Sequence, residues 1–127
     1  MANLYCRTVF FVKDASLARR FYVEKLGFAL DWDTKEGVLQ VSLFGFELIL
    51  NEVYEETTPR AGCGRLFIGL DEDQDEPFCR HIIEKKIPTT RRSWGRPTLV
   101  ITDIDGNELF FWMAYDDFSK LDAHAMP

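Results

Sequence analysis

The sequence has little of what disulfide-bonded and zinc-stabilised proteins usually need. Its 127 residues include only three cysteines, an odd number without Cys-x-x-Cys or Cys/His spacing. This pattern disfavours a disulfide framework and a structural zinc site. We therefore expect reduced thiols at Cys6, Cys63 and Cys79, with Cys6 and Cys79 packed inside.

Basic charge and long apolar runs are also scarce. The formal net charge is −6, and no apolar run approaches the ~18 residues of a membrane span. Nucleic acid and anionic membranes are disfavoured as partners because phosphate binding needs a basic face. An acidic surface favours a cationic or neutral ligand, although solubility alone accounts for such a charge. With no secretory segment behind Met1, we expect a cytoplasmic location.

Short β-branched and aromatic runs predict eight strands, four in each half of the chain. The predicted strands lie within residues 5–14, 28–33, 38–44, 46–51, 64–70, 88–93, 97–103 and 107–113. Phe44-Gly45 and Asp105-Gly106 are typical of hairpin turns. The polar segment 53–63, which contains proline and glycine, is interpreted as a connector.

A helix is predicted between the first and second strands of each half. Asp14 is the expected N-cap of the first helix and Gly27 its C-cap. Its apolar face is formed by Leu17, Ala18, Phe21, Tyr22 and Leu26. The second helix is expected to start at Asp75-Glu76-Pro77 and to stop before Pro88.

The two halves form an internal repeat. At an offset of 61 residues, Asp14 falls on Asp75, Leu26 on Ile87 and Gly45 on Gly106. Several matches in order indicate duplication of a β-α-β-β-β unit. Such a unit has one helix on one sheet face and leaves the other face bare. At this length we expect one domain with two modules.

Two sequence runs carry a resemblance to a known family. "FFVKDASLARRFYVEKLGF" and "WGRPTLVITDIDGNELFFW" resemble the vicinal oxygen chelate superfamily of glyoxalases, bleomycin resistance proteins and extradiol dioxygenases. The resemblance implies an α+β fold of two tandem βαβββ modules, forming a concave half-barrel sheet with helices outside. Residues 1–127 would be a single domain with modules 4–52 and 64–113, connector 53–63 and tail 114–127. Ile104 departs from the proline usual in the family's hairpin.

The resemblance also locates the positions where the family's enzymes hold a divalent metal with His, Gln or Glu. These positions fall on Arg7, Arg65, Phe110, and Ile49 or Leu50. None of these side chains offers a lone pair suited to a metal. Neither histidine falls on these positions: His81 lies on the second predicted helix and His124 in the C-terminal tail. No metal and no other cofactor is therefore expected.

The last predicted strand carries the strongest candidate binding residues. Strand alternation puts Glu108, Phe110 and Trp112 on one side, and Leu109 and Phe111 on the other. If the first side is concave, aromatic residues from other segments join it and stack a flat or cationic ligand. The alternative, that these rings close the core between modules, is equally open. The candidate ligand-binding residues are Arg7, Phe11, Trp32, Arg65, Trp94, Glu108, Phe110 and Trp112.

Arg7 and Arg65 occupy matching positions, as do Glu47 and Glu108. Cross-strand Arg–Glu pairs are one interpretation, because buried arginines need carboxylate partners. The alternative is that both glutamates are solvated near their turns. We favour that alternative for Glu47 and a pocket-rim role for Glu108. The basic cluster around Trp94 is interpreted either as an anion-binding lid or as a solvated turn.

No nucleophile with a histidine partner stands out, so catalytic residues are not assigned. The leading hypothesis is metal-free binding, or sequestration, of a small cationic or aromatic molecule by a homodimer, as the resemblance to bleomycin resistance proteins implies. One alternative is a metal-dependent lyase, isomerase or dioxygenase with atypical ligands such as Glu47 and Glu108. Another is a non-enzymatic interaction module.

Overall fold

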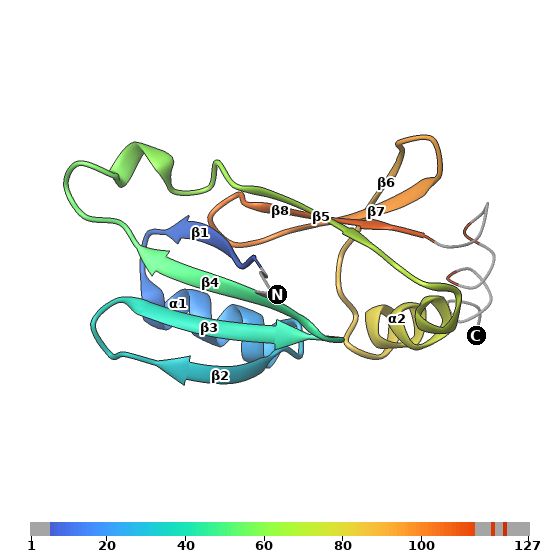
Figure 1. Cartoon of the computed structure of the whole chain (residues 1–127), viewed down its shortest axis with the longest axis horizontal. Coiled ribbons are helices and arrows are strands. Elements are labelled where there is room, and N and C mark those ends of the chain that lie inside the picture. Colours follow the sequence, from blue (N-terminus) through green and yellow to red (C-terminus); the bar gives the residue numbers. More distant parts are fainter. Residues whose placement is uncertain (1–5, 114–117, 119–120, 122–127) are drawn as a thin grey trace, which may run out of the picture. The chain divides into compact units, whose positions relative to one another are not determined.

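The computed structural model describes residues 6–113, 118 and 121, which form two compact units (Figure 1). The first unit contains the described residues up to Gly64 together with the turn Asp103–Asn107. The second contains Arg65–Thr102 and the described residues from Glu108 onward. Only residues 118 and 121 of the predicted tail belong to the described part of the chain.

The first unit is a four-stranded sheet with one helical segment. Its sheet order is β1-β4-β3-β2, with β1 parallel to β4 and the other neighbours antiparallel. The elements are β1 (Thr8–Val12), α1 (Ala15–Arg20), the π-helical turn η1 (Phe21–Lys25), β2 (Ala29–Asp33), β3 (Val38–Leu43), β4 (Phe46–Glu52) and the 3-10 turn η2 (Thr58–Arg60).

The second unit repeats this topology. Its sheet order is β5-β8-β7-β6, and β5 runs parallel to β8. The elements are β5 (Arg65–Gly69), α2 (Glu72–Glu84), β6 (Thr90–Ser93), β7 (Pro97–Thr102) and β8 (Glu108–Trp112). The predicted α+β fold of two tandem βαβββ modules is confirmed.

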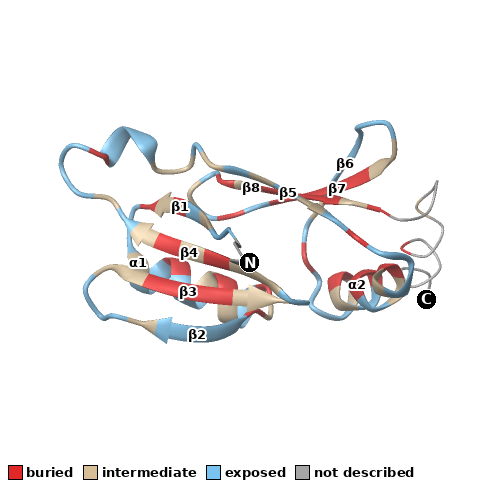
Figure 2. Cartoon of the chain, viewed as in Figure 1, coloured by how far each residue is buried: buried red, intermediate tan, exposed pale blue. Residues whose placement is uncertain are grey.

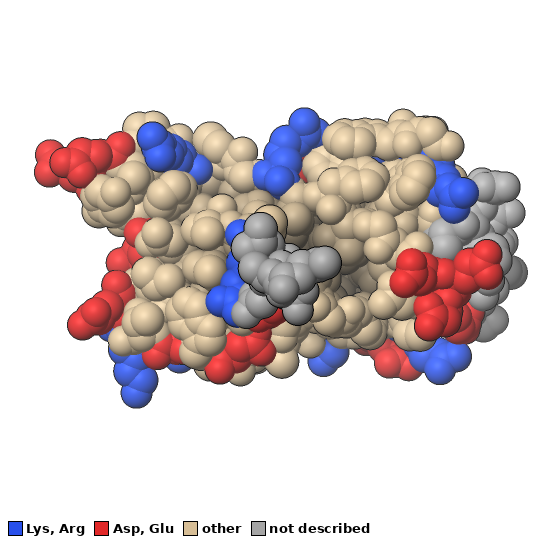
Figure 3. Space-filling view, viewed as in Figure 1, with Lys and Arg blue, Asp and Glu red and all other residues tan. Residues whose placement is uncertain are grey.

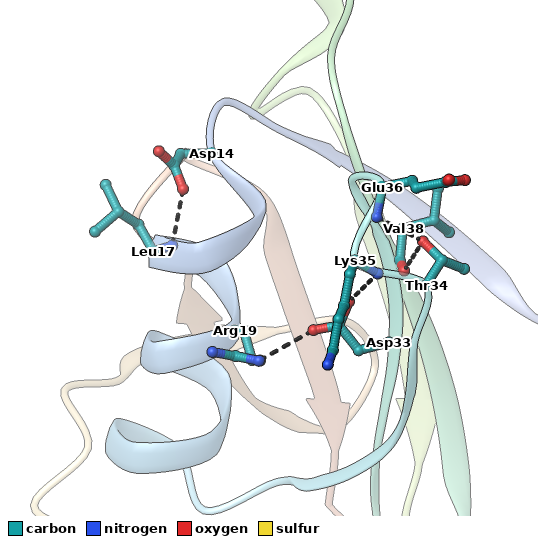
Figure 4. A network of polar contacts seen from close by, with 8 residues as sticks. All are labelled: Asp14, Leu17, Arg19, Asp33, Thr34, Lys35, Glu36 and Val38. Carbon is teal, nitrogen blue, oxygen red and sulfur yellow. Dashed lines mark hydrogen bonds and ion pairs between the residues drawn. The ribbon is translucent and has the colours of Figure 1, made fainter.

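Capping and an ion pair fix the first helix in its place. The Asp14 side chain accepts a hydrogen bond from the Leu17 amide at 3.0 Å, as expected of an N-cap. Further along α1, Arg19 reaches Asp33 at the end of β2, with 3.1 Å between Nη1 and Oδ2 (Figure 4). The Asp33 carboxylate also accepts from the Lys35 amide at 2.8 Å. The helix is therefore tied to the β2–β3 turn as well as to the core.

The core of the first unit lies under the central strands. Figure 2 shows the middle of β3 and β4 buried and the edge strand β2 exposed. From the helical segment, Ala18, Tyr22 and Leu26 are buried, four residues apart. Leu17, expected on this apolar face, is instead 52% exposed. It precedes the buried line by one position, which turns it about 100° away around the helix.

The second helix begins four residues earlier than the sequence suggested. Asp71 is its N-cap, and Gln74 closes a capping box by accepting from the Asp71 amide at 3.1 Å. Asp75 is buried and Pro77 lies inside the helix. The expected start at Asp75 is therefore wrong, because Pro77 was interpreted as a first-turn proline.

The same observation corrects the repeat. The two caps, Asp14 and Asp71, are 57 residues apart, whereas the hairpin glycines Gly45 and Gly106 are 61 apart. The modules are repeated, but no single offset relates them throughout. The second module has additional residues between its helix start and its last hairpin.

The thiols correct a second expectation. Cys79 on α2 is buried as predicted, whereas Cys6 is exposed because it precedes β1 and takes no part in the sheet.

Charged side chains on the face drawn in Figure 3 stand in small separate groups of either sign, and uncharged residues cover most of the described surface between them.

Candidate functional site

Four aromatic side chains of the second unit form one continuous cluster, here called the aromatic platform. Its members are Phe67, Trp94, Phe110 and Trp112. Trp94 stacks on Phe67 with ring centroids 5.5 Å apart and planes 19° apart. The ring centroids of Trp94 and Phe110 are 4.7 Å apart, and those of Trp112 and Phe67 are 5.9 Å apart. The rings therefore support one another as a single surface.

Strand register explains why these rings meet. β5 and β8 are parallel neighbours that place Phe67 opposite Phe110 and Gly69 opposite Trp112. Because side chains alternate along each strand, these residues share one face of the sheet. Leu109 lies in the core, and Phe111 packs on Phe78 of α2 at a centroid distance of 4.5 Å. The predicted alternation of β8 is confirmed.

The β6–β7 turn brings the remaining ring to the sheet. The Trp112 indole Nε1 donates to the Trp94 carbonyl at 3.1 Å, and the Trp94 amide donates to the Arg96 carbonyl at 3.1 Å. Gly95 adopts a φ of +79°, which a residue with a side chain rarely takes. This turn therefore holds Trp94 over the strands, although it belongs to no strand itself.

The platform is open to solvent on its outer rings. Phe67 is 45% exposed and Trp94 is 47% exposed, whereas Phe110 beneath them is only 3% exposed. Exposing two large rings side by side is unfavourable, so such patches usually mark a binding surface.

Two guanidinium groups border the platform. Arg65 Cζ lies 4.7 Å from the Phe110 ring centroid and 5.7 Å from that of Trp94. Its Nε donates to Glu108 Oε1 at 3.1 Å. Arg96 Cζ lies 4.9 Å from the Trp112 centroid. The local charge is thus mixed, and the only platform carboxylate among the described residues is already paired.

Five of the eight predicted site residues come together here: Arg65, Trp94, Glu108, Phe110 and Trp112. Phe67 was missed by the sequence interpretation. The signal was present, because Phe67 follows Arg65 by two positions in a strand parallel to β8, which puts both on one face.

The other three predicted residues, Arg7, Phe11 and Trp32, lie in the first unit. Arg7 Nε is 3.5 Å from Glu47 Oε2, so both Arg–Glu pairs form. The interpretation that Glu47 is merely solvated is wrong. The Arg60 Cζ atom lies 6.0 Å from the centroid of the Phe11 ring. Trp32, on β2, is 38% exposed. As parts of the other unit, these residues are not members of the aromatic platform.

The positions equivalent to the family's metal ligands do not suit a divalent cation. Strand alternation puts Leu50 in the core and Ile49 on the face that carries Glu47, so the fourth position is Ile49. The set is then two guanidinium groups and two hydrocarbons, none of which can donate a lone pair. Among residues 6–113, 118 and 121, no group of three or more His, Cys, Asp or Glu side chains could hold a metal ion.

Comparison with known protein families agrees with this topology. The family model for the Glyoxalase/Bleomycin resistance protein/Dioxygenase superfamily matches residues 6–111. The chain belongs to this superfamily. The match spans both βαβββ modules and confirms the resemblance drawn from the two sequence runs.

Solved structures with this superfamily fold include both binding proteins and an enzyme. The bleomycin-binding protein of Streptomyces verticillus, complexed with copper(II)-bleomycin, has a TM-score of 0.66 at 16% identity, covering 91% of this chain and 99% of that one. TnmS3, an antibiotic-binding protein from a Streptomyces species, has 0.59 at 24%, covering 89% and 98%. Lactoylglutathione lyase from Agrobacterium tumefaciens has 0.63 at 17%, covering 88% and 94%. At these identities the likeness establishes the fold alone.

A comparison of the sequence of this superfamily member with curated proteins found no match. None of the helices in the described part of the chain is long and apolar enough to cross a membrane.

Proposed function

We propose that this superfamily member binds a planar aromatic molecule on its aromatic platform and sequesters it without a metal. The observation that carries the proposal is the pair of stacked, half-exposed rings of Phe67 and Trp94 above the buried Phe110. Offset stacking on such rings adds about 0.5–1.5 kcal/mol beyond the area buried. Two similar structures, named for binding bleomycin and an antibiotic, are consistent with this kind of function.

Ring stacking, rather than the ligand's charge, is proposed to supply most of the affinity. The acidic composition favours a cationic or neutral ligand. At the platform, however, Glu108 is paired with Arg65, and Arg96 lies over Trp112. A cation would meet two guanidinium groups there, so a neutral or anionic ring fits at least as well.

Three probes with the same ring and different charges test this proposal: 2-naphthylmethanol, 2-naphthoate and 2-naphthylmethylammonium. We expect all three to bind with dissociation constants within about tenfold of one another, because the ring that they share supplies most of the affinity. A tenfold difference corresponds to about 1.4 kcal/mol. Calorimetry gives the constants, and the indole N–H signals of Trp94 and Trp112 report the location in a ¹⁵N-resolved NMR spectrum.

A matched pair of tryptophan variants locates the site. Trp94→Ala should weaken 2-naphthylmethanol binding about fivefold to tenfold through lost stacking. Trp32→Ala removes a similarly exposed ring from the first unit and should leave that affinity unchanged. Equal losses in the two variants, or no binding of any probe, would contradict the proposal. The latter result would favour an interaction module.

The competing hypothesis is a metal-dependent enzyme that uses Glu47 and Glu108. Both carboxylates already pair with arginines, which lowers their availability as ligands. Stoichiometric zinc, nickel, manganese or iron in protein purified without chelator, lost in Glu108→Ala, would favour the enzyme. The homodimer, the cytoplasmic location and a role in antibiotic resistance stay predictions.

A further inference from the structure

A buried amide stands at the centre of the polar face of the first sheet. Gln40, on β3, is only 3% exposed. Its Nε2 donates to Asp31 Oδ2 at 2.9 Å and to Glu47 Oε2 at 2.6 Å. Its Oε1 is buried and has no hydrogen-bond partner. The amide therefore has both donors engaged and its acceptor unused.

The two carboxylates fix the orientation of this amide. Turning it over would point Oε1 at two negatively charged groups and leave both N–H donors without them. The unused acceptor is thus held beside the carboxylates by the contacts on Nε2. A buried acceptor without a partner is unfavourable, and an unseen water or ion is one explanation of such an atom in a native protein.

An irregularity in β2 contributes the outer side of this site. The β2–β3 register shifts between Leu30 and Trp32, so that Asp31 is an extra residue next to the pair Trp32–Gln40. Bulges of this kind redirect side chains and are common beside functional sites. Asp31 Oδ1 also accepts from Ser42 Oγ at 2.9 Å, which holds the carboxylate over β3.

The charges select a small cation with N–H donors. Asp31 and Glu47 bring two negative charges, and Arg7, 3.5 Å from Glu47 Oε2, balances one of them. Asp31 is exposed and the Glu47 side chain is 38% exposed, so solvent reaches the carboxylates above the buried amide. A divalent metal fits poorly because the Gln40 N–H groups and the Arg7 guanidinium already face the carboxylate oxygens. An ammonium group supplies both the positive charge and a donor for Oε1.

We propose that Asp31, Gln40 and Glu47 form a binding site for the ammonium group of a small organic amine. The ammonium donates one hydrogen bond to Gln40 Oε1, and the carboxylates balance its charge. Trp32, half-exposed and adjacent to Asp31 in the bulge, is positioned to contact the organic part of the amine. The residues of this site belong to the first unit and those of the aromatic platform to the second. The probe for this site carries no aromatic ring, so failure of one proposal leaves the other standing.

The test compares two cations that differ in their donors. n-Butylammonium carries N–H groups, whereas tetramethylammonium has the same charge and none. Titrated into the full chain, n-butylammonium should shift the Gln40 side-chain amide signals in a saturable way. Tetramethylammonium should bind at least about tenfold more weakly, because it cannot bond to Oε1.

Variants on the same strands separate the site from general charge effects. Gln40→Met, which removes the acceptor at similar length, should weaken n-butylammonium binding about tenfold. Asp31→Asn, at an exposed position, should also weaken it. Asp33→Asn is the control, since it removes the same charge two residues along β2 from a carboxylate that engages Arg19 and Lys35 instead (Figure 4).

Three results would overturn the proposal. The first is the absence of any n-butylammonium shift at tens of millimolar, which would leave water as the partner of Oε1. The second is equal binding of tetramethylammonium, which would reduce the site to a negative surface. The third is an Asp33→Asn loss as large as that of Asp31→Asn, with all variants melting as cooperatively as the unaltered protein.

Discussion

The buried carboxylate of Asp103 gathers hydrogen bonds from two separate parts of the chain. Three come from backbone amides of its own turn, those of Asp105, Gly106 and Asn107, each at 2.9 Å. The Asn107 side chain adds one at 3.0 Å, and the Tyr22 hydroxyl adds one at 2.8 Å from the first helical segment. At the residue scale, this single side chain both shapes the turn and attaches it to the first unit.

Tyr22→Phe tests that attachment. A hydrogen bond to a charged group contributes about 1.5–3 kcal/mol, so we expect the free energy of unfolding at pH 7 to fall by about that amount. Burial, followed by the charge of Asp103, raises the pKa of Tyr22 well above its ordinary value of 10.0. The proton stays on the folded protein, so this contribution is full below pH 10 and is lost as the pH rises through the folded-state pKa.

Urea unfolding measured from pH 7 upward checks this pH dependence. The difference between the original protein and Tyr22→Phe should be constant up to about pH 10 and then shrink. Tyr54→Phe, at a residue that is 58% exposed, is the control and should change stability little at any pH. A Tyr22→Phe difference that grows in alkali would show that the sign of the pKa effect is wrong.

At the scale of elements, the Asp103–Asn107 turn is held by the segment that leads into β5. The Gly64 amide donates to Asn107 Oδ1 at 2.7 Å, and Asn107 Nδ2 donates to the Phe11 carbonyl at 3.0 Å. Gly62 has a φ of +79°, and a Cβ there would collide with the Asp105 carbonyl oxygen. The glycine thus allows two backbones to approach closely, beyond permitting its own conformation.

Gly62→Ala should therefore destabilise the protein by more than its backbone conformation alone requires. The left-handed conformation costs an alanine about 1–2 kcal/mol, and the collision with backbone adds to this because a carbonyl cannot move aside freely. Gly45→Ala is the matched control, since Gly45 has a φ of +92° and nothing within 4 Å of the added Cβ. Thermal or urea unfolding that gave equal losses for the two variants would refute the close approach.

Local rules in the sequence predicted the elements better than they predicted what packs on them. The Asp14 cap, the Phe44-Gly45 turn and the alternation of β8 follow from neighbouring residues, and the structure confirms them. The start of α2 was misplaced because Pro77 outweighed the Asp71–Gln74 capping box. Phe67 was missed because its place beside Phe110 depends on which strands are neighbours. The Gln40 network was missed for the same reason, since its members come from three strands.

At the scale of the whole molecule, the chain enters the first unit twice. The turn Asp103–Asn107 belongs to the first unit, although β7 before it and β8 after it belong to the second. A chain cut after Gly64 would therefore lack the acceptor of Tyr22, the acceptor of the Gly64 amide and the Asp105 side chain, which accepts from the Lys13 amide at 3.0 Å. We propose on this basis that residues 1–127 unfold as one domain, even though the chain forms two compact units.

Fragments of the chain test this proposal. Residues 1–64 alone should show no cooperative thermal transition, because the buried Tyr22 hydroxyl and the part-buried Gly64 amide lose their acceptors. Leaving a buried polar group unpaired costs about 1–3 kcal/mol. Mixing fragment 1–64 with fragment 65–127 should restore a transition, since the second fragment supplies the missing turn. The uncut chain should melt in a single step seen equally by circular dichroism and by calorimetry. Cooperative folding of residues 1–64 on their own would mean that the turn is dispensable and that the two modules are independent domains.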